Sequence, residues 1–218
     1  MLKKLFTSTL VFALILTTFC ITAFASDYYT DYTTLKYSTT SAQVTNLQND
    51  LKKLGYFSGT STGYFGTVTK ASVISYQKAK SITADGVVGH GTARAIKVDR
   101  VIQTAKSLQG VPYVWGGTTS SGFDCSGFTQ YVMAQNRMSI LRTAALQYTN
   151  GSSVSKSSLT RGDFVFFETY KSGASHVGIY IGNDQFISAQ SGAGKVMVGS
   201  LSSSYWSGAY VSARRLTN

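Results

Sequence analysis

One cysteine and one histidine are the residues of this chain best suited to chemistry. Cys125 lies in the segment GFDCSGF, residues 122–128, and His176 follows fifty-one residues later in HVGIYIG, residues 176–182. A thiolate is a strong nucleophile, and a nearby imidazole is a usual base for activating it. The pair therefore predicts nucleophilic catalysis, and the alternative is a buried structural thiol with a surface histidine.

The N-terminus has the three parts of an export sequence. Two lysines precede an apolar run, and an Ala-x-Ala pattern ends at Ala25. We expect residues 1–25 to be a cleaved signal peptide, which would remove Cys20 and leave Cys125 as the one thiol. The alternative is an uncleaved membrane anchor, since the run approaches the roughly 20 residues that cross a bilayer. Cleavage predicts a secreted or cell-wall-associated protein with no membrane contact.

Composition and charge narrow the class of protein. Of 218 residues, 43% are hydrophobic and 13% charged, which is typical of folded domains rather than of a disordered chain. The net charge is +11, and loss of the signal peptide lowers it to +9. In an exported protein this charge favours an anionic surface such as a cell wall over nucleic acid, unless it serves solubility alone.

Apolar residues at helical spacing organise the N-terminal half. Residues 26–40 are rich in Tyr, Thr and Ser without clear periodicity and are interpreted as a linker. A helix is predicted between a cap at Ser41 and a terminating glycine at Gly55. A second helix begins at Thr67, and a third, short one covers Thr92–Ile96.

The C-terminal half begins after a short predicted joint at Val98–Arg100 and a helical connection that ends at Gly110. A helix is predicted over residues 124–135, with Asp124 as N-cap and Cys125 in the first turn. The positive end of a helix dipole favours a thiolate, so we expect a lowered thiol pKa. Free N–H groups at a helix start also suit an oxyanion.

Three strands are predicted after that helix, at residues 164–167, 176–181 and 185–190. The second strand alternates, with aliphatic residues on one face and His176, Gly178 and Tyr180 on the other. The aliphatic face is assigned to the core. We expect the other face, and with it His176, to meet the start of the Cys125 helix.

A third polar group usually orients a catalytic histidine. A three-residue loop between the second and third strands places Gln190 opposite His176, whereas a five-residue loop places Ser188 there. Both residues lie on the same face, so alternation cannot distinguish them.

The first half resembles the three-helix peptidoglycan-binding domain 1 family over residues 41–97. The matching residues include Leu47-Gln48, Gly63-Tyr64-Phe65-Gly66, Tyr76-Gln77 and Asp85-Gly86-Val87-Val88-Gly89. The resemblance implies noncovalent retention on cell-wall glycopeptide. Most of the aromatic residues here are interpreted as core, and His90, placed in a turn, is given no chemistry.

The second half, residues 101–218, resembles the NlpC/P60 cysteine peptidases of bacterial cell walls. The matching elements are Pro112-Tyr113-Val114-Trp115-Gly116-Gly117, Asp124-Cys125-Ser126-Gly127-Phe128, Arg142-Thr143 with Gln147, Gly162-Asp163-Phe164-Val165-Phe166-Phe167, and residues 176–182.

The NlpC/P60 resemblance implies an α+β, papain-like domain in which the Cys125 helix packs on an antiparallel sheet. It makes Cys125 the nucleophile and His176 the base, with Tyr113 near the oxyanion and Asp124 and Ser126 shaping the substrate cleft. The family commonly has histidine at the position of Ser188. That departure leaves Ser188 and Gln190 as candidates for the third catalytic residue.

Together these features predict a two-domain peptidoglycan hydrolase that works through a thioester. The resemblance suggests cleavage between γ-D-glutamate and a diamino acid of the stem peptide. The alternatives are an N-acetylmuramoyl-L-alanine amidase and a wall-binding protein whose hydrolase domain is impaired at Ser188. Peptidoglycan is the expected partner, without nucleic acid or an obligate protein partner. No cofactor is required, and two histidines do not suggest a metal site.

Overall fold

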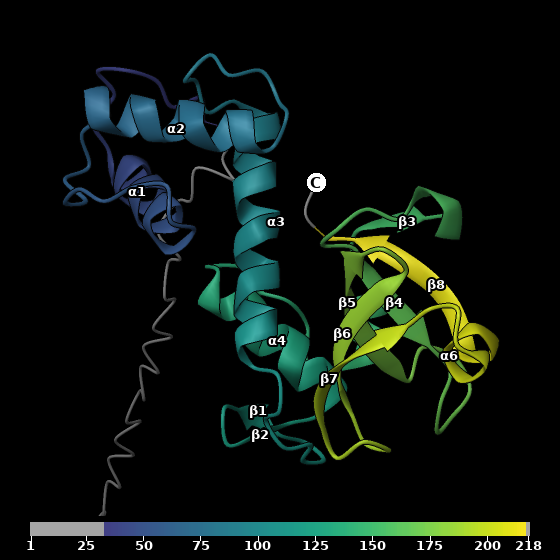
Figure 1. The fold of residues 1–218 in the computed structure, drawn as a ribbon. Helices are drawn as coiled ribbons and strands as arrows, with labels where there is room; N and C mark the ends of the chain where they lie inside the picture. The colour runs from purple at the N-terminus through teal and green to yellow at the C-terminus, as the bar shows by residue number, and fades with distance from the viewer. Residues whose placement is uncertain (1–32, 217–218) are drawn as a thin grey trace, which may run out of the picture.

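The computed structural model describes residues 33–216, so the predicted signal peptide lies outside the described part. Three helices form the N-terminal side, and a six-stranded antiparallel sheet with short helices forms the C-terminal side (Figure 1). The predicted α+β fold, with a helical domain before a papain-like domain, is therefore confirmed. No helix between residues 33 and 216 has the length and apolar character needed to cross a bilayer.

The first two helices of the N-terminal side begin as the sequence predicts. Helix α1 (Ala42–Lys53) is capped by Ser41, whose hydroxyl accepts a hydrogen bond from the N–H of Val44 at 3.2 Å. Gly55 follows α1 with a φ of +84°, a conformation that favours glycine. Helix α2 (Thr67–Ala79) starts at the predicted threonine.

Two buried glutamines fix the loops of this helical domain. The Gln48 side chain accepts from the N–H of Gly63 at 3.0 Å and donates to the carbonyl of Tyr64 at 2.9 Å. Gln77 accepts in the same way from the N–H of Gly86 at 2.9 Å. Each loop is thereby tied back to a helix by one side chain.

The described part of the predicted linker is folded onto the helical domain. Leu35 is fully buried and forms a β-bridge with Val88, and Thr40 forms one with Tyr64. The interpretation of residues 33–40 as a linker was therefore wrong. The segment has no periodicity of its own because its pairing partners are distant in sequence.

Helix α3 (His90–Ser107) is continuous over 18 residues and replaces the predicted short helix, joint and helical connection. His90 is its first residue rather than part of a turn. The expected joint is helical because its residues are buried against other elements. Arg100, for example, is 6% exposed and lies 3.5 Å from the carboxylate of Asp50 in α1.

Two carboxylates connect the helical domain to the rest of the molecule. Asp50 of α1 lies 2.5 Å from the guanidinium of Arg137, which follows helix α4. Asp99 of α3 lies 2.8 Å from Lys80, which follows α2, and 3.0 Å from Arg161, which precedes strand β4. The two halves are thus joined by side chains as well as by one helix.

The sheet has the strand order β3-β8-β4-β5-β6-β7, and all neighbouring strands are antiparallel. Its strands are β3 (Ser152–Val154), β4 (Phe164–Phe167), β5 (His176–Gly182), β6 (Gln185–Gln190), β7 (Lys195–Ser200) and β8 (Tyr210–Arg215). The remaining elements are β1 (Thr118–Thr119), β2 (Gly122–Phe123), α4 (Cys125–Gln135), α5 (Ala144–Tyr148), the 3₁₀ helix η1 (Lys156–Ser158) and α6 (Ser204–Ala209).

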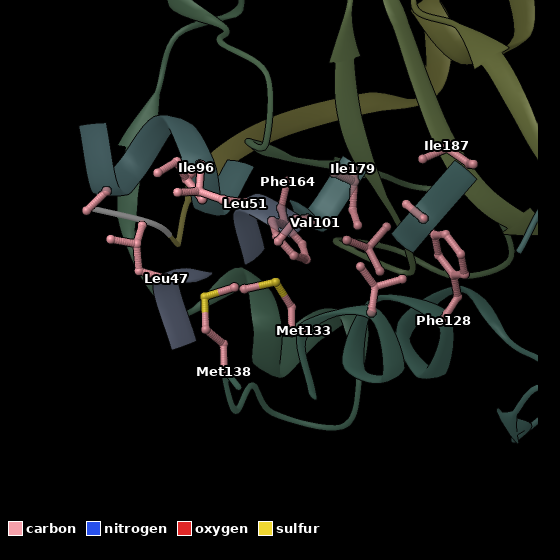
Figure 2. Packing of buried hydrophobic residues seen from close by; sticks show 14 of the residues in the cluster. Leu47, Leu51, Ile96, Val101, Phe128, Met133, Met138, Phe164, Ile179 and Ile187 are labelled. Carbon is pink, nitrogen blue, oxygen red and sulfur yellow. The ribbon is translucent and has the colours of Figure 1, made fainter. Parts of the chain in front are cut away.

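One hydrophobic core runs from the helical domain to one face of the sheet. Leu51 of α1, Val101 of α3, Phe128 of α4 and Ile179 and Ile187 of the sheet belong to the same cluster (Figure 2). A second, smaller cluster lies on the opposite face and is covered by α6. The Cys125 helix therefore packs on the aliphatic face of β5 and β6.

Candidate active site

Helix α4 begins at the candidate nucleophile. Asp124 is its N-cap and accepts a hydrogen bond from the N–H of Gly127 at 2.6 Å, and Cys125 is the first helical residue. A Cβ atom on Gly127 would lie only 2.1 Å from the carbonyl oxygen of Gly117. The preceding loop therefore packs directly on the first turn. The predicted cap and helix start are confirmed.

An arginine supports the Asp124 cap from a separate segment. Arg142 donates to both carboxylate oxygens of Asp124, at 3.1 and 2.6 Å, and to the Ser126 hydroxyl at 3.0 Å. Burial raises the pKa of Asp124, but the hydrogen bonds from Arg142 and Gly127 outweigh it, and the net pKa is lowered. Asp124 is therefore an ionised, structurally fixed carboxylate.

Gln147 of α5 bonds to both the first turn of α4 and the segment that carries Arg142. It is fully buried, donates to the carbonyls of Ser126 and Leu141 at 3.0 and 2.8 Å, and accepts from the Thr129 hydroxyl at 2.8 Å. Since one amide side chain satisfies groups on α4 and on the Arg142 segment, it holds the two in a fixed relation.

The thiol of Cys125 lies against the beginning of β5. Its Sγ is 3.9 Å from the carbonyl oxygen of Ser175, and the N–H of Val177 also points at the sulfur. The thiol therefore contacts the backbone on both sides of His176. Burial, with only 7% of the residue exposed, raises the thiol pKa to about 11 despite the favourable N–H groups. The expectation of a lowered pKa was wrong, because desolvation exceeds the effect of the helix start.

The His176 imidazole is enclosed by aromatic rings and a hydroxyl. Its Nε2 lies 3.1 Å from Ser188 Oγ, and its ring centroid lies 5.0 Å from that of Trp206 and 5.9 Å from that of Phe167. Burial lowers the pKa of His176 to about 4, against an opposing effect of the Asp124 carboxylate. Both Cys125 and His176 are therefore neutral at pH 7.

The strand register explains how His176 reaches Ser188. Ile179 pairs with Ile187, and this register continued along β5 places His176 opposite Gln190. The hydrogen bond nevertheless runs diagonally to Ser188, past Gly178. A Cβ on Gly178 would lie 3.2 Å from the Ser188 Cβ, so the glycine leaves this path open. The Gln190 amide nitrogen is buried and has no partner among the described residues.

The environment of His176 differs from the prediction in one respect. We expected the start of the Cys125 helix to pack on the His176 face of β5, but α4 packs on the aliphatic face and Trp206 of α6 covers His176. Only the N-terminal end of α4 reaches the end of the sheet at which strand β5 begins. Cys125 therefore lies on the side of the aliphatic face of β5, His176 lies on the opposite face, and the two residues meet at the end of the sheet where β5 begins.

Two cavities mark this region. The first, of about 350 Å³, contains the thiol and the predicted substrate-binding residues, and its lining includes Tyr113, Asp124, Cys125, Ser126 and Arg142. The second, of about 280 Å³, contains the imidazole, and its lining includes His176, Gln190, Tyr205 and Trp206. Burial and the nearby Cys125 and Asp124 raise the pKa of Tyr113 to about 12, so its hydroxyl stays protonated.

Sequence reasoning assigned no role to several residues of the site. Arg142 belongs to a matching element, and its spacing from Asp124 could have suggested an ion pair. Trp115 and Tyr170, exposed at the mouth of the first cavity with ring centroids 5.2 Å apart, and Trp206 were not singled out for chemistry. Trp206 lies in a Ser- and Tyr-rich stretch without periodicity, which gives no indication of its contact with His176.

Comparisons with known families agree with this architecture. Residues 110–215 match the family model described as "NlpC/P60 family", and residues 40–96 match the one described as "Putative peptidoglycan binding domain". The two matches cover well over half of the chain and follow the order of the two structural parts.

Individual relatives show the same likeness. "Probable peptidoglycan endopeptidase LytE" of Bacillus subtilis is 50% identical over 56% of this chain and 35% of its own length. "Gamma-DL-glutamyl hydrolase" of the same organism is 40% identical over 70% of this chain and 38% of its own length. The chain thus spans little more than a third of these two relatives.

A solved structure extends the likeness to most of the fold. The peptidoglycan hydrolase RipB from Mycobacterium tuberculosis is 27% identical, with a TM-score of 0.53, over 81% of this chain and 84% of that one. From the site geometry, the two family models and these relatives together, the chain belongs to the NlpC/P60 family, with a peptidoglycan-binding-type domain before its Cys-His domain.

Proposed function

We propose that this protein is a peptidoglycan hydrolase that cleaves an amide bond of the stem peptide, between γ-D-glutamate and a diamino acid. We further propose that it acts outside the cell, at the wall. A relative named as a γ-DL-glutamyl hydrolase, 40% identical over 70% of the chain, supports the γ-glutamyl bond. The matched peptidoglycan-binding domain supports the wall as its partner.

The observation that carries the proposal is the position of the Cys125 sulfur. It lies at the first residue of α4 and contacts the backbone of the residues before and after His176. A nucleophile at a helix start, a base at the adjoining strand start and a cavity that opens on the sulfur are the parts that acyl transfer requires.

The first half-reaction starts from neutral groups. If Nε2–H donates to Ser188, Nδ1 keeps the lone pair that takes the thiol proton. The sulfur then attacks the carbonyl carbon, and the carbonyl oxygen becomes an oxyanion. We assign its stabilisation to the N–H groups at the start of α4 and to the Tyr113 hydroxyl, which is protonated and near the thiol.

The second half-reaction returns the enzyme to its starting state. The His176 imidazolium gives its proton to the leaving amine, the C–N bond breaks, and a thioester remains on Cys125. His176 then takes a proton from water, whose oxygen attacks the thioester, and the proton returns to the sulfur as the acid product leaves. The cycle consumes one water and needs no redox partner.

The walls of the first cavity would bind the acyl side of the substrate. Asp124 and Ser126 are held by Arg142 and cannot rearrange without losing its hydrogen bonds. They therefore present a preorganised polar wall beside the sulfur, and Tyr113 lines the same cavity.

The test is digestion of purified muropeptides by the full chain, followed by mass spectrometry. We expect release of a peptide with a new amine on the diamino acid, and a loss of at least about 10³-fold in rate for Cys125→Ala. Val211→Ala, on an exposed residue of β8, is the matched control and should retain the wild-type rate.

Each other outcome would indicate a different function for this protein. A new amine on L-alanine would identify an N-acetylmuramoyl-L-alanine amidase on the same fold. Equal and negligible rates for wild type and Cys125→Ala, with binding to walls retained, would identify a wall-binding protein that has lost catalysis. Either result overturns the proposed reaction.

A further inference from the structure

The helical domain contains a cavity that the reaction at Cys125 does not use. It measures about 380 Å³, within the range of small-molecule sites, and lies between the loop after α1 and the start of α2. Its lining consists of two tyrosines, a phenylalanine, a valine, four threonines, a glutamine and two glycines. None of these lining residues carries a charge, although the whole chain has a net charge of +11.

Exposed apolar side chains surround this cavity. Tyr37 is 49% exposed, Tyr64 is 45% and Val68 is 57%, and these three are among the most exposed large hydrophobic residues in the described part of the chain. The aromatic residues of this domain were interpreted mostly as core. Tyr37 and Tyr64 instead present ring surface to solvent, and Tyr37 comes from the segment first interpreted as a linker.

Glycines allow two rings of the cavity to lie against the backbone. A Cβ on Gly66 would lie 3.1 Å from the Tyr64 ring, and a Cβ on Gly59 would lie 3.0 Å from the Phe57 ring. Each ring therefore lies where a side chain at the glycine would press against it. A flat aromatic surface held in this way is suited to stacking against a flat apolar face of a ligand.

The segments that carry the two tyrosines are fixed to each other. The N–H of Ser38 donates to the carbonyl of Phe65 at 3.0 Å, and the N–H of Phe65 donates to the carbonyl of Thr39 at 2.8 Å. Gln48 below them bonds to the Tyr64 carbonyl and to the Thr69 hydroxyl, each at 2.9 Å. The cavity is therefore preorganised, which reduces the entropy cost of binding.

The chemistry of the lining selects one part of peptidoglycan. Stem peptides carry carboxylates and amines, which need charged or strongly polar partners when they are desolvated. An N-acetylated sugar ring is neutral, has an apolar C–H face for an aromatic ring, and has hydroxyl and acetamido groups for threonine hydroxyls. We propose that this cavity binds a sugar ring of the glycan strand, with Tyr37 and Tyr64 as its stacking surfaces.

This inference rests on the proposed function, because that function identifies peptidoglycan as the ligand. The experiment below distinguishes failure of sugar binding from failure of the proposed hydrolysis. The full chain carrying Cys125→Ala is titrated calorimetrically with an N-acetylglucosamine oligomer and, separately, with a stem peptide that has no sugar. We expect the oligomer to bind through the cavity of the helical domain, and any binding of the stem peptide at the Cys125 cavity to be unaffected by substitutions of Tyr37 and Tyr64. In the same background, Tyr37→Ala with Tyr64→Ala should weaken oligomer binding by at least about tenfold, whereas Tyr64→Phe should not.

Two further variants show whether the ring surface itself matters. Gly66→Ala, at a φ of −89° that any residue adopts, displaces the Tyr64 ring without removing it and should also weaken oligomer binding. Leu146→Ala removes a large hydrophobic side chain that is 47% exposed on α5 of the other domain and should leave oligomer binding unchanged.

Two outcomes would overturn the inference: unchanged oligomer binding in the double tyrosine variant, or binding of the sugar-free stem peptide that the double variant abolishes. Failure of the proposed function looks different, since it appears as no hydrolysis of soluble stem peptide by the chain with Cys125 intact. That hydrolysis should be the same in the double tyrosine variant as in wild type. Circular dichroism of each variant confirms that the helices are retained.

Discussion

Burial sets the protonation of the two reacting side chains. Desolvation raises the pKa of Cys125 to about 11 and lowers that of His176 to about 4, so at pH 7 the thiol is protonated and the imidazole neutral. This resting state differs from a thiolate-imidazolium pair. In the proposed mechanism the proton moves from Cys125 to His176 as part of the attack, and substrate that displaces water from the cavity need not bury a preformed ion pair.

The thiol should therefore react with iodoacetamide in proportion to hydroxide over a wide range. Between pH 7 and pH 10 we expect the alkylation rate of Cys125 to rise about tenfold per pH unit, because the thiolate fraction does so below a pKa near 11. Mass spectrometry of the labelled peptide measures the rate, and Cys125→Ala is the blank. A rate that is already constant from pH 5 to pH 8 would show an ion pair instead.

Ser188 and Gln190 can be separated as orienting residues. Ser188 bonds to His176 Nε2 at 3.1 Å, whereas the Gln190 amide nitrogen has no partner among the described residues. Ser188→Ala should lower kcat about fivefold, because the imidazole loses an orienting hydrogen bond worth roughly 1 kcal/mol. Gln190→Met, which keeps the volume but removes the amide, should leave kcat within about twofold.

The pH dependence of kcat/KM distinguishes orientation from general damage. If Ser188 positions His176, Ser188→Ala should move the acidic limb of the profile, because that limb reports the titration of the imidazole. An unmoved profile with a lowered maximum, or a larger loss for Gln190→Met than for Ser188→Ala, would assign the orienting role away from Ser188.

The start of α4 is the element on which the site depends most. Gly127 has no room for a side chain, since its Cβ would lie 2.1 Å from the Gly117 carbonyl. Gly127→Ala should therefore push the first turn of α4 from the loop before β1, lower the free energy of unfolding by about 1–3 kcal/mol and reduce kcat. Urea unfolding and the muropeptide assay measure the two effects.

A second helical glycine supplies the control for that substitution. Gly91 lies in the first turn of α3, and a Cβ there would meet no atom within 4 Å. Gly91→Ala should leave kcat unchanged and stabilise the protein by up to about 1 kcal/mol, because alanine favours the helix. Equal effects of the two substitutions would contradict the importance of the contact between Gly127 and Gly117.

The elements predicted correctly from sequence are those that depend on neighbouring residues. The caps at Ser41 and Asp124 bond to N–H groups within three residues, and the alternation of β5 separates the His176 face from the aliphatic face. Such patterns depend only on residues that are close together in the sequence, so periodicity and capping rules detect them. They were enough to place Cys125 at a helix start and His176 at a strand start.

The elements that were missed depend on partners far along the chain. Asp99 and Arg100 were interpreted as part of a joint, but Asp99 pairs with Lys80 after α2 and with Arg161 before β4, and Arg100 pairs with Asp50 of α1. In the same way, Leu35 pairs with Val88. Hydropathy cannot show that a charged residue is buried beside an opposite charge. The position of Trp206 over His176 has the same cause, since it arises only when α6 folds back on the sheet.

At the scale of the whole molecule, the two domains share one core. The main hydrophobic cluster contains residues of α1 and α3 as well as of α4 and the sheet, and Asp50 and Asp99 add ion pairs across the same junction (Figure 2). A shared helix, a shared core and ion pairs on two buried carboxylates leave little of the usual boundary between domains. The sugar-binding cavity proposed above would therefore hold the catalytic domain in a fixed orientation to the glycan.

A shared core predicts that the domains unfold together. Both tryptophans lie in the NlpC/P60 domain, so their fluorescence reports that domain alone, whereas circular dichroism at 222 nm also reports α1, α2 and α3. In urea the two curves should coincide for wild type. Asp50→Asn, which leaves Arg137 and the buried Arg100 without their counter-charge, should shift both curves together by about 3 kcal/mol. Curves that separate in wild type would show two independent domains, and the fixed orientation of the catalytic site to the wall would then have no basis.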